Sequence, residues 1–280
     1  MLKFIKQSIK TGMVTQSLPE LREGFSKFKG LPLMEQVMWN PEVFENSVNL
    51  CPSDAMTFDD GKEGEPSRFR LLMGRCISCG LCEEAFPELF RLSERQDLSV
   101  RDPNDLIRTI SPEEKTPVLT YEKDTENVGF KVKNQIQKFF GRSLHIREVD
   151  TGSCNACEWE ITALTNPFYD IQRFGIDFVA SPRFADMLLV TGPVTRSMEE
   201  ALLKTYEATP DPKWVVAVGA CACDGGIFPE NYSTIGGLNK VLPVDVFIPG
   251  CPPSPLAVLN GIFLALGKTQ QKIKKGIPKD

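Results

Sequence analysis

The second half of the chain alternates short apolar runs with stretches of helical pattern. The apolar runs are LHIREV (144–149), IDFVA (176–180), ADMLLVTG (185–192), KWVVAVGA (213–220) and VDVFIPG (244–250). The helical candidates are residues 156–164, 196–206 and 255–266. Strands that alternate with helices build βαβ units and a parallel sheet. We therefore predict an α/β domain with a parallel sheet over residues 141–268.

Polar and apolar positions in the first dozen residues fit an amphipathic helix. One face holds Leu2, Phe4, Ile5 and Ile9, and away from it lie Lys3, Lys6 and Lys10. This helix either packs on the body of the protein or lies at a membrane surface or against a membrane-bound partner. Short basic amphipathic helices can bind a membrane surface in this way. Both interpretations stay open for this N-terminal segment, residues 1–35.

The middle of the chain divides into a module and a linker. Residues 36–102 contain four cysteines, few periodic signals and many turn residues, which is typical of a small module organised by a metal. Residues 103–127 are polar and contain three prolines, and a helical pattern from residue 131 stops at Gly141, a C-terminal cap. We assign residues 103–140 to a linker and helix, and residues 269–280 to a solvated tail.

Composition narrows the classes of function. The 280 residues carry a net charge of −5, which argues against a nucleic-acid partner because such partners select a basic face. No G-x-G-x-x-G or phosphate-binding loop occurs, so nothing supports nucleotide binding. We expect no membrane span, since no run of about 18 apolar residues exists, and no secretory signal. In a cytoplasmic chain, nine cysteines bind metal more readily than they form disulfides.

The first group of cysteines has the spacing of an iron–sulfur site. Cys76, Cys79 and Cys82 form C-x2-C-x2-C, and Cys51 is followed by a proline. In bacterial two-cluster ferredoxins each run reads C-x2-C-x2-C-x3-C-P, and its fourth cysteine serves the other cluster. Here the first half keeps only its fourth cysteine and the second half keeps only its first three. The four surviving cysteines therefore belong to one cluster.

The positions without a ligand form a set of their own, which consists of Pro41, Phe44, Ser47 and Phe86. The pattern resembles a degenerate ferredoxin domain with one [4Fe–4S] cluster left. We expect the four positions to line the place of the lost cluster, where two phenyl rings would fill much of the volume. The alternative is a four-cysteine zinc site, although zinc sites more often use two CxxC pairs.

Three of the other cysteine positions follow apolar runs. Cys154 comes after the first run, Cys221 after the fourth and Cys251 after the fifth. Ligands of parallel sheets sit at the carboxyl ends of the strands. These three positions, far apart in the sequence, are therefore expected at one edge of the sheet.

The segments around these cysteines resemble a known family. GRSLHIREVDTGSCNACEWEI, TGPVT, GGIF and PVDVFIPGCPP are similar to the small-subunit family shared by membrane-bound [NiFe] hydrogenases and respiratory Complex I, in particular to its formate-hydrogenlyase branch. The resemblance covers about residues 141–268. It implies a flavodoxin-like parallel sheet, which a small α+β ferredoxin-like 4Fe–4S domain precedes in this chain.

The resemblance also implies ligands and partners. By position the ligands are Cys154, Cys157, Cys221 and Cys251, holding one [4Fe–4S] cluster beside the active site of a hydrogenase-like large subunit. Cys221 is chosen over Cys223 because the family ligand stands four residues before a Gly-Gly pair, so Cys223 is expected to be a bystander. Other iron–sulfur and membrane subunits are implied as well. The chain would then be peripheral on the cytoplasmic face of the cell membrane.

Three hypotheses of function follow. The first is an electron-transfer subunit of a respiratory or energy-converting [NiFe] hydrogenase-type complex, with two [4Fe–4S] clusters and no catalytic residue of its own. The second is the small subunit of a Complex I-like dehydrogenase. That branch typically has two adjacent cysteines, whereas two residues separate Cys154 from Cys157 here. The third is a zinc-stabilised assembly protein without a redox role.

Three other polar residues carry weaker signals. The single histidine, His145, lies inside the first apolar run, so we expect a packed structural role, with coupling of protonation to cluster reduction as the alternative. Glu158 and Glu160 follow Cys157. We expect them at the helix surface or against the large subunit, with a proton relay as the alternative.

Overall fold

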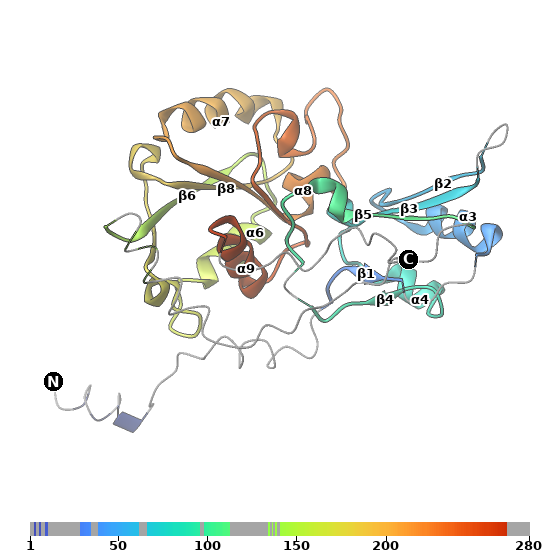
Figure 1. Ribbon diagram of the computed structural model, residues 1–280, viewed down its shortest axis with the longest axis horizontal. Helices are drawn as coiled ribbons and strands as arrows, with labels where there is room; N and C mark the ends of the chain where they lie inside the picture. The colour runs from blue at the N-terminus through green and yellow to red at the C-terminus, as the bar shows by residue number, and fades with distance from the viewer. Residues whose placement is uncertain are drawn as a thin grey trace.

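The computed structural model describes residues 3, 6, 9, 10, 29–34, 39–61, 66–95, 98–112, 134, 136, 138 and 141–267. Two bodies lie side by side (Figure 1): a parallel sheet with its helices, and a smaller group of antiparallel strands and short helices. The larger body comes from the second half of the chain. We call the other, formed by residues 29–112, the small body.

Five strands form the larger sheet. They are β6 (Leu144–Asp150), β7 (Ile176–Phe178), β8 (Met187–Thr191), β9 (Trp214–Val218) and β10 (Val246–Ile248). Their order is β10-β9-β8-β6-β7, and every neighbouring pair is parallel. Numbered along the chain and read from β7, this is the order 2-1-3-4-5 of flavodoxin-like sheets. The five predicted strands and the flavodoxin-like fold are confirmed.

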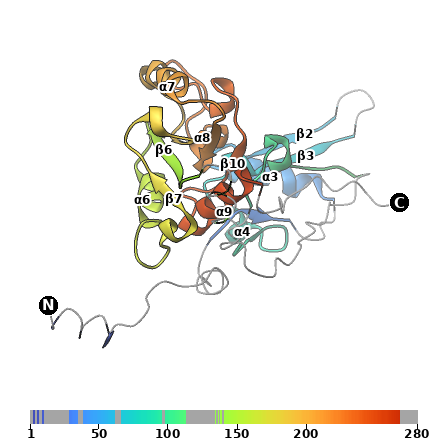
Figure 2. The same cartoon turned by 60° about the vertical axis from the view of Figure 1, so that its left-hand side comes forward.

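Helices cover both faces of this sheet (Figures 1 and 2), which explains why its strands read as continuous apolar runs. On one face pack α6 (Ala156–Ala163) and α9 (Pro255–Ala265), and on the other α7 (Arg196–Ala208) and α8 (Gly219–Asp224). Strand β8 shows the division, since Met187 and Leu189 belong to the core under α6 and α9. Leu188 and Val190 belong to the opposite core. Short 3-10 turns complete the connections: η3 (Ile171–Phe174), η4 (Pro182–Phe184) and η5 (Leu238–Lys240).

The small body is built on a three-stranded antiparallel sheet. Its strands, in the order β2-β3-β5, are β2 (Met56–Asp59), β3 (Arg68–Leu72) and β5 (Ile107–Ile110). Around it lie α3 (Pro41–Leu50), α4 (Leu81–Ala85), η1 (Met73–Arg75), η2 (Pro103–Leu106) and the short pair β1 (Pro32–Leu33) and β4 (Arg91–Leu92). Phe44 of α3 stacks on Phe69 of β3, with ring centroids 4.6 Å apart. Aromatic packing therefore fixes α3 against the sheet.

The small body extends further than the sequence pattern predicts. Residues 103–110, expected to begin the linker, hold η2 and strand β5 instead, and β5 pairs with β3 along its whole length. Helix α3 also lies where few periodic signals occur. The start of α3 nevertheless has typical sequence signals: the Asn40 side chain caps the helix, and Pro41 occupies its first turn.

The two bodies share one hydrophobic core. Phe44 and Phe69 belong to the same cluster of buried residues as Val190 of the large sheet. Val100 forms an isolated antiparallel bridge with Phe247 of β10, through N–H to carbonyl hydrogen bonds of 3.0 and 2.8 Å in the two directions. The small body therefore pairs with the edge strand of the larger sheet at this bridge.

Several expectations fall on residues outside those described. Leu2, Phe4 and Ile5 of the N-terminal segment are among them, as are residues 113–133 of the expected linker and the tail 269–280. Lys3, Lys6, Ile9 and Lys10 are helical, and Ile9 is exposed. None of the helices in the described ranges is both long and apolar enough to cross a bilayer.

A glycine in α9 sets how closely this helix approaches β10. A Cβ atom at Gly261 would overlap Cδ1 of Ile248 and lie 2.5 Å from its Cγ1. We predict that Gly261→Ala lowers the free energy of unfolding by about 1–3 kcal/mol, because the added methyl overpacks the core. Urea unfolding followed by circular dichroism measures the change.

Removing the opposing side chain provides the control. Ile248→Ala is destabilising by itself because it leaves a cavity. Since the new methyl would partly occupy that cavity, the double variant should lose less stability than the sum of the two single variants. Additive losses would show that Gly261 is not limited by its contact with Ile248.

Candidate metal centres

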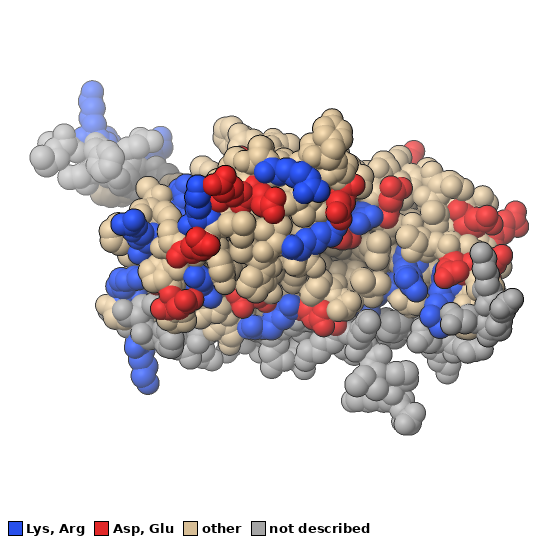
Figure 3. Space-filling model, turned by 90° about the horizontal axis from the view of Figure 1, so that it is seen from above, with Lys and Arg blue, Asp and Glu red and all other residues tan. Residues whose placement is uncertain are grey.

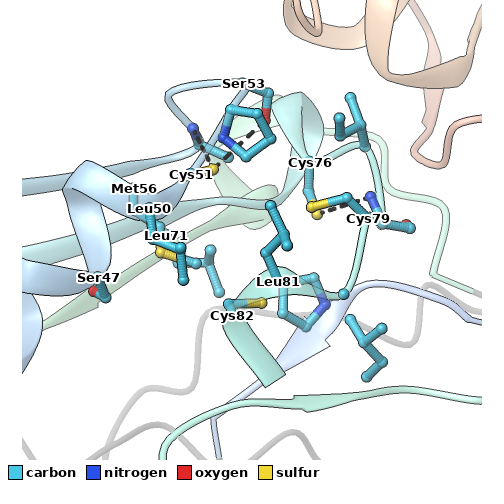
Figure 4. A pocket seen from close by; sticks show the side chains of 17 residues that line it. Ser47, Leu50, Cys51, Ser53, Met56, Leu71, Cys76, Cys79, Leu81 and Cys82 are labelled. Carbon is cyan, nitrogen blue, oxygen red and sulfur yellow. Dashed lines mark hydrogen bonds between the residues drawn. The ribbon is translucent and has the colours of Figure 1, made fainter. Parts of the chain in front are cut away.

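The first four cysteines line one cavity of the small body (Figure 4), although Cys51 is far from the other three in the sequence. Cys51 directly follows α3, and Cys76 directly follows η1. Cys79 lies in the loop after Cys76, and Cys82 lies in the first turn of α4. The structure thus brings together the four residues that the ferredoxin pattern groups.

Backbone geometry in this cavity presents N–H groups to sulfur. Ala55 N–H lies 3.4 Å from Cys51 Sγ, and Ser78 N–H lies 3.3 Å from Cys76 Sγ. Ser78 and Gly80 both have positive φ, 52° and 88°, so the chain reverses tightly between the cysteines. Hydrogen bonds of this kind favour the thiolate form that iron binds and tune the potential of an iron–sulfur cluster.

Burial opposes the ionisation of two thiols of this group when no metal compensates their charge. It raises the pKa of Cys76 to about 12 and that of Cys82 to about 11. Cys51 and Cys79 add to both shifts by charge repulsion, which shows that all four sulfurs are within electrostatic range of each other. Four thiols around an apolar cavity fit a cationic iron core, which would offset this repulsion.

The second four cysteines come from three strand ends of the large sheet. Cys154 follows β6, and Cys157 lies in the first turn of α6. Cys221 lies in α8 directly after β9, and Cys251 follows β10. The predicted convergence on the carboxyl edge of the sheet is therefore observed.

The charges of these four thiols also influence one another. Burial, and then Glu158, Cys221, Cys251 and Cys154, raise the pKa of the Cys157 thiol. Burial, with Cys251 and Cys154 next in importance, raises the pKa of Cys221 to about 12. Cys154 and Cys251 are exposed, so one side of this group faces the protein surface.

Two glycines leave room beside these sulfurs. A Cβ atom at Gly219 would lie 2.6 Å from Cys157 Sγ, and one at Gly226 would lie 3.2 Å from Cys221 Sγ. Both glycines have positive φ, 89° and 56°, which other residues rarely adopt. Four thiols with this space beside them fit a bulky multi-iron group with soft sulfur ligands.

Cys223 does not join this group in the same way. Its side chain is buried in the core, and its sulfur lies 3.9 Å from the carbonyl oxygen of Ala217. Burial raises the pKa of this thiol well above its usual value. This placement is compatible with the bystander role expected for Cys223.

Acidic residues lie beside the second group. Thr191 donates a short hydrogen bond to Glu158, whose second carboxylate oxygen is buried without a partner among the described residues. Burial, with Glu158 next, raises the pKa of Glu148, and burial raises the pKa of Glu160. Sequence reasoning missed Glu148 and Thr191. Their signal is a polar residue near the end of each of two neighbouring apolar strands.

The single histidine lies away from the second cysteine group. His145 is at the start of β6, at the other end of the strand from Cys154, and its Nδ1 is 3.1 Å from the carbonyl oxygen of Phe184.

The positions expected to line the place of a lost cluster differ in their burial. Phe44 and Ser47 are buried, and Phe86 packs against the same core. Pro41 is exposed, so that part of the expectation is wrong: Pro41 and Glu42 at the start of α3 face solvent, whereas Phe44 points into the core.

Fold and cysteine groups together define a flavodoxin-like α/β protein joined to a cysteine-containing small body. Residues 154–265 match the family described as NADH ubiquinone oxidoreductase, 20 Kd subunit. The chain belongs to this family, because a relative 51% identical to it is matched over 86% of its own length. The family match begins at Cys154, so the first cysteine group lies outside it.

Three relatives show the range of this family. A probable membrane-bound hydrogenase subunit, mbhJ of Pyrococcus furiosus, is 51% identical over 144 residues, which are 51% of this chain and 86% of that protein. Formate hydrogenlyase subunit 7 of Escherichia coli is 49% identical over 142 residues, 51% of this chain and 56% of that protein. An NADH-quinone oxidoreductase subunit of Geotalea daltonii is 49% identical over 119 residues, 42% of this chain and 67% of that protein. The relatives are named as subunits of hydrogenase and oxidoreductase complexes.

The space beside Cys157 gives a testable prediction. Gly219→Ala would place a methyl group against Cys157 Sγ. If both cysteine groups hold iron, this variant should lose iron from the second group and retain it fully in the first. Iron analysis and electron paramagnetic resonance (EPR) of the reduced protein measure this. The matched control is Gly267→Ala, because Gly267 also has positive φ but has open space around its Cα. Equal iron loss in both variants would assign the effect to backbone strain.

The raised thiol pKa values predict how stability of the iron-free protein depends on pH. Cys76, Cys82 and Cys221 keep their protons up to a pH of about 11–12 in the folded state, whereas unfolded thiols ionise at about 8.5. Their protonated form therefore favours folding fully below about pH 8.5, and this contribution is lost as the pH rises through the folded values. Urea unfolding of the chelator-treated protein should show a falling free energy of unfolding from about pH 8 to about pH 10. Replacing the three cysteines with alanine should reduce that dependence, and the rest should come from Cys157, Cys223 and Cys251, whose pKa values are also raised.

Proposed function

We propose that this chain is an electron-transfer iron–sulfur subunit of a membrane-associated, [NiFe]-hydrogenase-type complex. In this proposal one [4Fe–4S] cluster is held by Cys51, Cys76, Cys79 and Cys82, and another by Cys154, Cys157, Cys221 and Cys251. The observation that carries it is the gathering of each set of four thiols. The first set lines one cavity, and the second lies at the carboxyl edge of the sheet beside two glycines that leave room for a bulky group. The small body would then be the degenerate ferredoxin-like domain.

When bound, each cluster would accept and give up one electron. The chain's own residues supply the rest. Thiolates anchor the iron, and N–H groups of Ala55 and Ser78 face two sulfurs of the first group. Burial limits the access of water to Cys82 and, in part, to Cys76 and Cys157. No residue of this chain needs to break a bond in such a role.

A large subunit would dock where the second group reaches the surface. Cys154 and Cys251 are exposed there, and Trp159 of α6 has 70% of its surface exposed although it is large and apolar. Ile227 and Phe228, which follow the Gly226 turn, are exposed as well. Exposed aromatic and aliphatic side chains that gather on one part of a surface mark protein–protein interfaces. A hydrogenase-like large subunit is the partner that the hydrogenase relatives suggest.

Other subunits would complete the complex and hold the chain at the cytoplasmic face of the membrane. Acidic and basic side chains are interspersed on the face shown in Figure 3, which supports protein partners over nucleic acid. A Complex I-like dehydrogenase is the second candidate, because the NADH-quinone oxidoreductase relative is almost as similar to this chain as the hydrogenase relatives are. The two-residue spacing between Cys154 and Cys157 favours the hydrogenase type. Nickel in the co-purified large subunit separates the two candidates.

Metal analysis tests the cluster proposal. The anaerobically purified protein should contain about eight irons and eight sulfides per chain. Cys51→Ala and Cys79→Ala should each erase the same EPR signal, and Cys221→Ala should erase the other one. Cys223→Ala is the matched control next to Cys221 and should retain both signals. A preparation with zinc and no visible absorption would contradict the proposal, and about four irons would remove one of the two sites.

A further inference from the structure

The two cysteine groups meet at a contact between η1 and α8. Turn η1 leads directly into Cys76 of the first group, and α8 carries Cys221 of the second. Gly74 lies in the middle of η1 and is buried. A Cβ atom at Gly74 would lie 3.7 Å from Cβ of Asp224 and 3.8 Å from Cβ of Cys223, both in α8. The two ligand-bearing segments therefore lie side by side at this glycine, with room for a methyl group and nothing larger between them.

An ion pair closes the same contact. The Arg75 Nε group donates to the Asp224 carboxylate at 3.2 Å and lies 3.3 Å from the backbone oxygen of Asp224. Arg75 immediately precedes Cys76. The two side chains are 28% and 41% exposed, so the pair adds little net stability. Its geometric effect remains, because two contacts to one residue fix how the end of α8 sits on η1.

A second contact joins the same two groups from another side. A small cavity of about 20 Å³ is lined by Ser78, from the loop between Cys76 and Cys79, and by Pro249 and Gly250, which precede Cys251. Ser99, whose hydroxyl is buried without a partner in the described part of the chain, also lines it. The cavity has room for about one water molecule. Together with the Val100–Phe247 bridge, these contacts hold the two groups at a fixed distance.

We propose that electron transfer between the two cysteine sites crosses the η1–α8 contact, with Gly74 setting its spacing and Arg75 acting as a positioning residue. This inference rests on the proposed function. The transfer moves one electron: one site is oxidised by one electron as the other is reduced by one, and no bond forms or breaks. Gly74 is suited to the task because a side chain larger than a methyl group would push α8 away from η1.

The test uses the full chain, purified anaerobically, with Gly74 as the probe. The backbone of Gly74 does not have the positive φ that excludes side chains, and a methyl group would keep ordinary contacts of 3.4 Å or more. Gly74→Ala is therefore the matched control. Gly74→Val is the test variant, because its larger side chain should push α8 away from η1. The readout is the magnetic splitting between the two sites in the EPR spectrum of the fully reduced protein, which depends on their separation. We expect the splitting to be kept in Gly74→Ala and weakened or lost in Gly74→Val, at equal iron content.

Arg75 supplies a second, independent variant. Arg75→Met removes the contact with Asp224 while keeping much of the side-chain bulk, and Arg75→Lys restores the charge. We expect Arg75→Met to alter the splitting and to increase amide hydrogen exchange in α8, with partial recovery in Arg75→Lys. If Gly74→Val loses iron, the two Arg75 variants alone test whether the η1–α8 contact sets the splitting. Hydrogen exchange of the iron-free variants provides a readout that does not depend on the clusters.

The outcomes separate the inference from the proposed function. Unchanged splitting in both Gly74→Val and Arg75→Met, with full iron content, would overturn the role of the η1–α8 contact and leave the electron-transfer function standing. Wild-type protein that holds fewer than two clusters would overturn the proposed function itself. A splitting lost in Gly74→Val and altered in Arg75→Met, with iron retained, would support the inference.

Discussion

The carboxyl edge of the parallel sheet is the constraint on which the second cysteine group depends. Strands β6, β9 and β10 are far apart in the sequence, yet parallel pairing makes them end on the same side. Each strand can then deliver a cysteine within a few residues of its last hydrogen bond. The loops must also bend tightly, so glycines with positive φ stand at Gly219 and Gly226. A side chain at either position would point at Cys157 or Cys221. The same two glycines therefore allow the tight turns and leave space for a bound group.

The sheet can keep this edge in place because helices and the small body bury both of its faces. The small body is part of that burial: Phe44, Phe69 and Val190 belong to one core. Removing it would expose apolar surface on the sheet as well as unpair the backbone of Val100 and Phe247. Each cysteine group therefore depends on the folding of both bodies. Burial of the thiols opposes their ionisation, and a bound iron core would relieve that cost.

Much of the larger body could be predicted from sequence, for a physical reason. Strands buried on both faces read as continuous apolar runs, so β6 to β10 stand out, and α7 and α9 are long enough to show their pattern. Helix α8 was not predicted because GACACD has small residues and no period; its position depends on packing between β9 and η1. Strand β5 was not predicted because its sequence, IRTI, is short and polar enough to resemble a linker. It is a strand because β3 offers it a partner.

The sequence spacing of the cysteines predicts which residues form each group. It does not predict how the two groups lie relative to each other. C-x2-C-x2-C and the Cys-Pro pair identify the first set, and the strand ends identify most of the second. The choice of Cys221 over Cys223 rests on resemblance in the sequence, and the structure adds a physical basis: Cys223 Sγ faces the Ala217 carbonyl inside the core. Nothing in the sequence connects Gly74 with Asp224, which lie in different halves of the chain. That proximity arises only when the small body docks on the sheet, so the distance between the two groups is a property of the tertiary structure and is fixed in the same folding event that forms them.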